Sequence, residues 1–129
     1  MPREDNASIS VYLDDKVVFS SNGKWLHPLF ELEQALPSLP HPVSALTVHD
    51  KIVGAAAAFL MAFLGIRHMH AGVLSQPAET VLKRFDIAYQ FDLRVDRIAC
   101  TTETLLSPAM DMQDAVDILR ARALKARNV

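Results

Sequence analysis

Two short polar stretches carry residue types that could bind an anion or polarise a carbonyl group. "TVHDKIVG" runs from Thr47 to Gly54, and "VLSQPAE" runs from Val73 to Glu79. Each stretch follows an apolar segment typical of a buried strand and precedes a segment typical of a helix. Free backbone N–H groups at the start of a helix bind anions. The residues that we expect to bind a ligand at these two junctions are Asp50, Lys51, Gly54, Ser75 and Gln76.

Helix capping is the simpler explanation of the same residues. Asp50 stands where it could cap the apolar helix, and Ser75 or Gln76 could cap the helix after it. If the two preceding strands are neighbours in a parallel sheet, however, both helix starts open into one crevice at the carboxyl edge of the sheet. That shared edge favours a ligand site over caps alone.

A polar turn upstream could close this crevice. "SNGK" (Ser21–Lys24) is typical of a turn, in which we expect Gly23 to adopt a positive φ. If the turn folds over the crevice, Asn22 and Lys24 also contact the ligand. Trp25, the single tryptophan, could cover the pocket or pack in the core or against another subunit. The expected ligand is a small molecule with an anionic or carbonyl group, and a nucleotide-like molecule is the expectation by fold analogy.

Two alternative functions stay open. The first is a metal-free enzyme at the same edge, with Lys51 as electrophile or amine and Asp50 as acid or base. It requires Lys51 to be buried, because a reactive lysine needs a lowered pKa. The second is a non-catalytic structural or interaction subunit, in which the amphipathic helix at 111–127 docks on another chain. A homodimer is the expected assembly of the chain.

Alternating strand and helix patterns predict an α/β fold around these junctions. The order indicates a three-layer α/β/α sandwich with a mixed, mostly parallel sheet of about five strands. We expect one domain over residues 1–129, with a loose tail at 1–7 and a C-terminal helix at 111–127. The other expected elements are a hairpin at 8–21 with its turn at Asp14–Asp15, strands at 43–48, 68–75 and 87–93, and helices at 27–36, from Asp50 to Ile66, and 76–85.

Composition argues against several classes of protein. Thirteen basic residues face fifteen acidic ones, so the chain lacks the basic excess of a nucleic-acid binder. The apolar run Ile52–Ile66 is shorter than the roughly 20 residues that span a bilayer. The N-terminus has no apolar signal segment, and the single cysteine, Cys100, suits a reducing compartment. We therefore expect a cytoplasmic protein that binds neither membrane nor nucleic acid.

The pieces "DKIVGAAAAFL" and "GVLSQPAETVLKRFDIAYQF" carry a resemblance to a known family. With "VVFSSNGKWLHPLFEL" upstream and "RIACTTETLLSPAM" downstream, residues 8–110 resemble an uncharacterised prokaryotic domain-of-unknown-function family with a cytidine-deaminase-like fold. The resemblance implies the same α/β/α sandwich, a pocket at the two helix starts, and no established reaction. A "CPME"-like tetrapeptide of that family would fall on Ser107–Met110, where only Pro108 is kept.

The zinc chemistry of deaminases does not carry over to this chain. A zinc deaminase needs H-x-E at one helix start and P-C-x-x-C at the next. Here Lys51 or Ile52 takes the place of the glutamate, and Ala78 and Val81 take the places of the cysteines. Zinc-dependent deamination is therefore not expected.

Histidines are the remaining metal option. His68 and His70 share one face of an expected strand, but we expect His49 and His68 at opposite ends of the sheet. A zinc site needs three or four converging ligands. We therefore predict no metal and no cofactor, and assign no role to this histidine pair.

Overall fold

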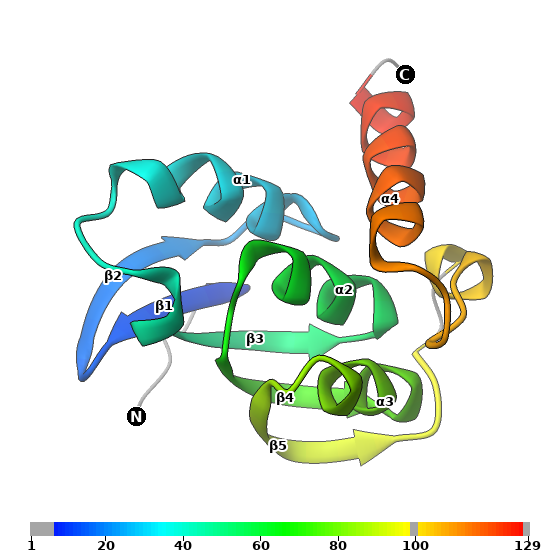
Figure 1. Ribbon diagram of the computed structural model, residues 1–129, viewed down its shortest axis with the longest axis horizontal. Coiled ribbons are helices and arrows are strands. Elements are labelled where there is room, and N and C mark those ends of the chain that lie inside the picture. Colours follow the sequence, from blue (N-terminus) through cyan, green and yellow to red (C-terminus); the bar gives the residue numbers. More distant parts are fainter. Residues whose placement is uncertain (1–6, 99–100, 128–129) are drawn as a thin grey trace.

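A mixed sheet organises the chain in the computed structural model, which describes residues 7–98 and 101–127 (Figure 1). Its strands are β1 (Ile9–Leu13), β2 (Lys16–Ser21), β3 (Thr47–Val53), β4 (His68–Ser75) and β5 (Ala88–Val95). They lie in the order β2-β1-β3-β4-β5. β1 pairs antiparallel with β2 and with β3, whereas β3, β4 and β5 run parallel. The predicted mixed, mostly parallel five-strand sheet is thus confirmed.

The helices occur where the sequence predicts them, with shifted bounds. They are α1 (His27–Ala35), α2 (Ala55–Leu64), α3 (Gln76–Arg84) and α4 (Met112–Arg127), with short 3₁₀ turns at η1 (Leu36–Ser38), η2 (Val43–Ala45) and η3 (Thr101–Leu105). Pro28 and Pro77 lie in the first turns of α1 and α3, where a proline costs no helical hydrogen bond. The α/β class and the predicted order of elements are confirmed.

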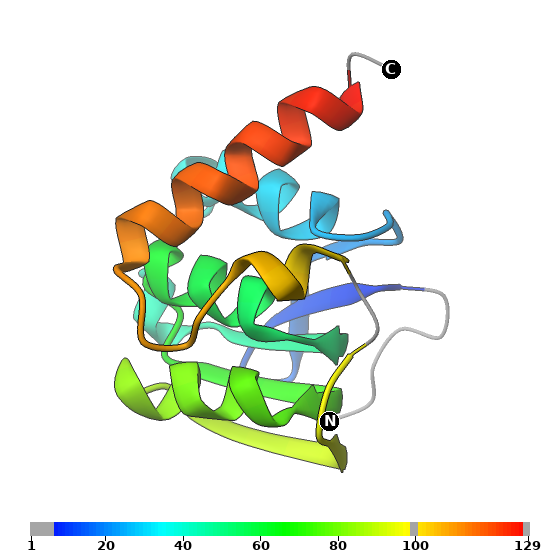
Figure 2. The same cartoon turned by 90° about the vertical axis from the view of Figure 1, so that its right-hand side faces the viewer.

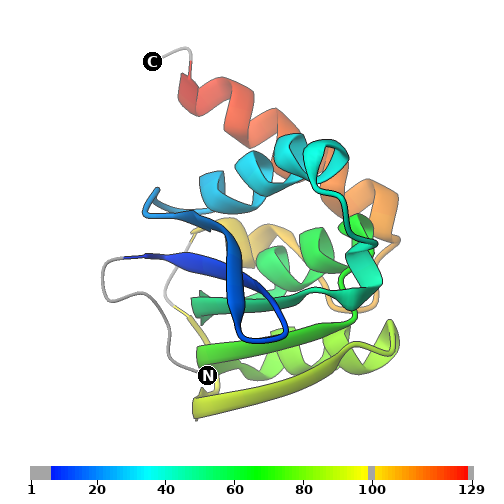
Figure 3. The same ribbon diagram turned by 90° about the vertical axis from the view of Figure 1, so that its left-hand side faces the viewer.

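The predicted three-layer arrangement is wrong, because the described helices all lie on one face of the sheet (Figure 2). The crossovers β3-α2-β4 and β4-α3-β5 move in the same direction along the sheet, so crossovers of one hand place both helices on the same face. α1, α3 and α4 each contact α2. The opposite face carries no helix within the described residues (Figure 3). An alternating pattern predicts how many helices there are but not which face each one covers.

The helix α2 is the centre of the core. Residues Ala55–Met61 are all buried, and the alanines let the neighbouring helices approach closely. The helix ends at Gly65, whose φ of 88° suits glycine. Neither α2 nor any other helix in the described ranges has both the length and the hydropathy to cross a bilayer.

The start of α2 differs from the prediction. Asp50 does not cap a helix, because β3 continues to Val53 and pairs Asp50 with Ile9 on one side and Ala71 on the other. The expected strand at 43–48 is therefore a 3₁₀ turn followed by the first residues of β3. Periodicity cannot separate the apolar end of a strand from the apolar helix that follows it.

The C-terminal helix α4 belongs to the same core. Ala115, Val116 and Leu119 are fully buried, and α4 contacts α2. Arg120 donates two hydrogen bonds to Glu33 of α1, at 3.0 and 2.6 Å. This ion pair, more than the partial burial that opposes it, raises the pKa of Arg120.

Candidate functional site

An open cleft of about 520 Å³ lies where β3 ends and α2 begins. Its walls come from the end of β3, the first turn of α2, the turn after β2, and two residues that follow β5. We call it the first cleft. The residues that line it are Ser8, Asn22, Gly23, Lys24, Trp25, Leu26, Asp50, Lys51, Ile52, Gly54, Ala56, Ala57, Ile98 and Glu103.

Most of the predicted ligand-binding residues meet in this cleft: Asn22, Lys24, Asp50, Lys51 and Gly54. Ser8 explains why segments so distant in sequence come together. Its carbonyl accepts a hydrogen bond from the amide of Lys51 at 3.1 Å. Its hydroxyl donates to the carbonyl of Gly23 at 2.6 Å. The start of the hairpin therefore ties the 21–24 turn to β3, as a closing turn over the crevice requires.

Glu103 occupies the start of α2. The amide of Ala55 donates to Oε1 at 2.6 Å, and the amide of Ala56 donates to Oε2 at 3.0 Å. Both carboxylate oxygens are thus held by N–H groups at the positive end of the helix dipole. The expectation that this helix start offers these N–H groups to a ligand is wrong, because the chain supplies its own carboxylate.

Gly54 makes this contact sterically possible. A Cβ atom at this position would lie 2.5 Å from the carboxyl carbon of Glu103 and closer still to Oε1. The atoms nearest to Gly54 on this side are therefore those of Glu103, a residue that follows β5 in the chain. Gly54 is also the N-cap residue of α2 and, like any glycine, offers no capping side chain, so Glu103 replaces a local cap with one from a distant segment.

The side chain of Trp25 lines the cleft from a strained backbone. Its φ is 58°, a left-handed conformation that is rare for a bulky residue. Gly23, predicted to hold the positive φ of this turn, does not adopt one. Trp25 is 37% exposed, and its ring makes edge contact with the ring of His27, with ring centres 5.6 Å apart. Backbone strain of this kind gathers at functional sites.

Lys51 is exposed at the edge of the first cleft. The metal-free enzyme needs a buried lysine, so the position of this side chain gives that alternative no support. Lys24 lines the same cleft and is exposed as well.

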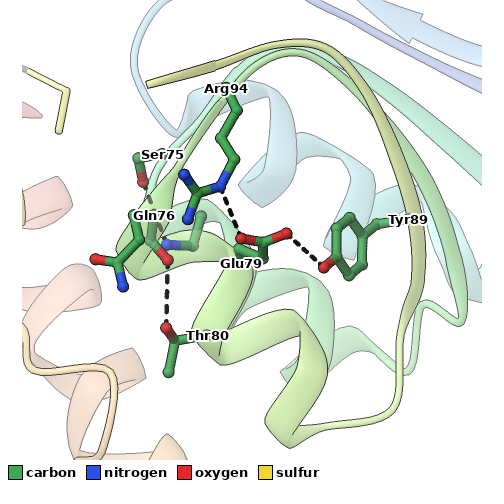
Figure 4. A network of polar contacts seen from close by, with 7 residues as sticks. Ser75, Gln76, Glu79, Thr80, Tyr89 and Arg94 are labelled. Atoms are coloured by element: carbon green, nitrogen blue, oxygen red, sulfur yellow. Dashed lines mark hydrogen bonds and ion pairs between the residues drawn. The ribbon is translucent and has the colours of Figure 1, made fainter. Parts of the chain in front are cut away.

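Ser75 and Gln76 do not line the first cleft. Ser75 is fully buried, and its hydroxyl accepts a hydrogen bond from the amide of Ala78 at 3.2 Å, so it is the predicted cap (Figure 4). Gln76 is exposed, and its carbonyl accepts a hydrogen bond from the Thr80 hydroxyl at 3.3 Å. Neither residue lines a further cleft that lies beside the start of α3.

A second cleft of about 630 Å³ lies beside the start of α3 and is lined by Pro77, Arg97, Ile98, Glu103, Thr104, Leu106 and Pro108. Ile98 and Glu103 line both clefts. The starts of α2 and α3 do lie on one edge of the sheet, because Val53 and Leu74 are paired neighbours. The single crevice predicted there is therefore divided, with Ile98 and Glu103 between its two parts.

Glu79 joins α3 to β5 (Figure 4). The Tyr89 hydroxyl donates to one carboxylate oxygen at 2.6 Å, and Nε of Arg94 donates to the other at 2.8 Å. The hydrogen bonds from Tyr89 and then Arg94 lower the pKa of Glu79. Burial and the bond to Glu79 raise the pKa of Tyr89 to about 12. Glu79 thus pairs across to β5.

Histidines gather on the sheet face that lies opposite the helices. The rings of His49 and His70 are stacked at 5.1 Å, and Nε2 of His70 lies 2.8 Å from Asp92. His49, His68 and His70 line one cavity of about 310 Å³. The expectation that His49 and His68 lie at opposite ends of the sheet is wrong, because β3 begins at Thr47, the partner of His68. Within the described residues, no group of three or more potential ligands could hold a metal ion.

The remaining sequence features divide between described and undescribed parts of the chain. Cys100 lies outside the described residues. The Ser107–Met110 stretch, the position of the "CPME"-like tetrapeptide, is held by Arg84, whose Nη1 donates to the carbonyls of Pro108 at 3.1 Å and Met110 at 2.6 Å. Sequence reasoning missed Glu103, Ile98 and Arg94, because each acts through contacts between segments that are distant along the chain.

Comparison with known proteins identifies a family without a known function. No curated protein is significantly similar to this chain. The crystal structure of a DUF1893 family protein (TM1506) from Thermotoga maritima matches with a TM-score of 0.78 and 24% identity, over 90% of this chain and 80% of that one. At this identity the match shows a shared fold alone. The family model TM1506, a domain of unknown function (DUF1893), matches residues 2–122. The chain therefore belongs to the DUF1893 family.

Proposed function

We propose that this protein binds a small nucleotide-like molecule in the first cleft and that it does so without zinc chemistry. One observation carries the proposal. An indole ring, two lysines and two carboxylates line one open cleft at the carboxyl end of a parallel strand. Ligands of open α/β sheets bind at this edge. A volume of about 520 Å³ is within the range of small-molecule sites.

Each part of a nucleotide has a matching group in the cleft. Trp25 is partly exposed, and its indole offers a flat surface on which a base can stack. Lys24 and Lys51 offer positive charge to a phosphate. The apolar side chains of Ile52 and Ile98 complete the walls. The predicted anionic group is thus assigned to the lysines, because Glu103 already holds the α2 N–H groups that the sequence suggested for it.

A cytidine-deaminase-like scaffold is part of the proposal. The strand order and the two helix starts on one sheet edge support it. The residues at those starts do not supply zinc ligands: α2 begins after Gly54 with alanines, and α3 begins with Gln76 and Pro77. We expect purified protein to contain no stoichiometric zinc by elemental analysis, and EDTA to leave nucleotide affinity unchanged.

Intrinsic fluorescence can test the binding, because Trp25 is the single tryptophan. Titration with the 5′-monophosphates of adenosine, cytidine, guanosine and uridine should quench or shift its emission in a saturable way. Calorimetry on Lys24→Ala and Lys51→Ala should show weaker binding, whereas Lys16→Ala, an exposed lysine outside the cleft, should bind normally. If no nucleotide binds at millimolar concentration by either method, the proposal fails.

A second candidate function, assembly with a second copy of the chain, is favoured by an apolar patch. Ile52, Val73 and Leu93 are register partners across β3, β4 and β5. Ile52 is 58% exposed and Leu93 is 57% exposed. We propose that this patch is buried in a homodimer. Leu93 lies outside the first cleft, so Leu93→Asp tests the patch without changing a cleft residue, and it should shift the mass measured by light scattering from dimer to monomer. A monomeric wild-type protein would refute the dimer.

A further inference from the structure

We infer that Glu103 recognises an amino group of the ligand, so that the cleft selects bases with an exocyclic amino group over bases with an oxo group at the same position. This inference rests on the proposed nucleotide site. An unoccupied helix start would present N–H donors to a ligand. At the start of α2 the chain presents the carboxylate of Glu103 instead. An ionised carboxylate only accepts hydrogen bonds. The ligand atom that meets it must therefore be a donor.

The carboxylate of Glu103 is held in place and still has acceptor capacity. One amide binds each oxygen, at 2.6 and 3.0 Å, and these are the hydrogen bonds that it makes to described residues. A carboxylate offers about four acceptor sites, so about two remain. Glu103 lines the first cleft, and Gly54 leaves the space that lets it stay there. The group is thus pre-positioned, which reduces the cost of ordering it when a ligand binds.

The rest of the cleft limits what can carry the amino group. Trp25 favours a flat ring, and Lys24 and Lys51 favour an anionic substituent. A simple ammonium compound would fit the carboxylate but would leave the indole and the lysines without a partner. An amino-substituted heterocycle joined to a phosphate, such as an adenine or cytosine nucleotide, uses all three features. An oxo group in place of the amino group would set an acceptor against an acceptor.

Matched pairs of nucleotides test this selection in the wild-type protein. Cytidine and uridine 5′-monophosphates differ in the 4-amino or 4-oxo group, and adenosine and inosine 5′-monophosphates differ in the 6-amino or 6-oxo group. A good carboxylate-to-base contact discriminates by a factor of about 10 or more. We expect the amino member of at least one pair to bind at least tenfold more tightly, by Trp25 fluorescence and by calorimetry.

Glu103→Gln provides the second arm, because a glutamine amide can accept from an amino group or donate to an oxo group. We expect the ratio of the affinities for the amino and oxo nucleotides to fall to within about threefold. The contribution of the phosphate group to binding should stay unchanged. Lys24→Ala should weaken both members of a pair equally and keep their ratio. Circular dichroism establishes whether Glu103→Gln is folded, and if it is not, the wild-type pairs alone decide.

The outcomes separate this inference from the proposal on which it rests. If no nucleotide binds, the proposed site itself is wrong. If nucleotides bind but amino and oxo members bind alike, the selection by Glu103 is wrong and the site stands. A wild-type preference that survives unchanged in folded Glu103→Gln would also overturn the role of Glu103.

Discussion

Replacing Gly54 with alanine tests whether Glu103 holds the start of α2. The new Cβ atom would overlap the Glu103 carboxylate, so the carboxylate must leave the amides of Ala55 and Ala56. The backbone of Gly54, with φ −103° and ψ −176°, can itself accept alanine without strain. The substitution therefore acts mainly through a side chain that lies 49 positions away along the chain.

The size of the effect follows from the contacts that are lost. A hydrogen bond to a charged group contributes about 1.5–3 kcal/mol, and loss of a helix cap costs about 0.5–2 kcal/mol. Glu103 is half-buried, so water can solvate the released carboxylate and reduce the loss. We expect Gly54→Ala to lower the free energy of unfolding by about 2 kcal/mol. For a chain of 129 residues this corresponds to about 7 °C in Tm.

A double-mutant cycle measured by urea unfolding and circular dichroism isolates the contact. Glu103→Ala alone should cost about 2 kcal/mol, because it removes the same hydrogen bonds. Added to Glu103→Ala, Gly54→Ala should cost about 0.5 kcal/mol or less, since nothing remains to displace. Asp96→Ala, which removes an exposed carboxylate nearby in sequence, should change stability by less than about 0.5 kcal/mol. Equal costs of Gly54→Ala in both backgrounds would refute the contact.

Three further predictions concern the elements around the site. Ultraviolet titration should show one tyrosine that ionises near pH 12, and this step should be absent in Tyr89→Phe. Because the pKa of Tyr89 is raised in the folded state, its contribution to stability is present below about pH 10 and is lost as the pH rises towards 12. The pKa of Glu79 is lowered from 4.5, so its contribution to stability is present at neutral pH and is lost as the pH falls below 4.5. Acid unfolding should therefore depend less on pH in Glu79→Gln than in the wild-type protein. A chain that ends at residue 110 loses the three fully buried side chains of α4, whose burial contributes about 4 kcal/mol. Its thermal unfolding transition should therefore be broad or absent. A cooperative transition would instead make α4 an interface element.

Local signals explain which elements the sequence predicts well. The start of α3 is marked by a capping serine followed by Pro77, and the structure places the helix at Gln76–Arg84 with Ser75 as its cap. β4 was predicted with its observed bounds, His68–Ser75, because it is closed by a short connection on one side and a cap on the other. Such signals depend on residues a few positions apart, which a single sequence displays directly.

Contacts between distant segments explain the errors. The helix predicted to start at Asp50 fails because strand pairing with Ile9 and Ala71 extends β3 across Asp50 and Lys51. The three-layer prediction fails because the direction of strand addition, which decides the face that a helix covers, leaves no periodic trace in the sequence. The same extension of β3 explains the wrong prediction for the histidines, because it brings His49 beside His70.

The candidate site shows the same division between local and distant causes. Polar residues at the carboxyl end of a strand were sufficient to predict five lining residues, because the topology of parallel sheets places ligands there. The prediction of free N–H groups at the start of α2 is wrong, because the amides of Ala55 and Ala56 donate to Glu103, which presents an acceptor there instead. No residue near Glu103 in the sequence indicates that its side chain binds the start of α2. The one local indication is Gly54 itself, because a glycine at a helix start leaves both the capping position and the space above it to a group from elsewhere.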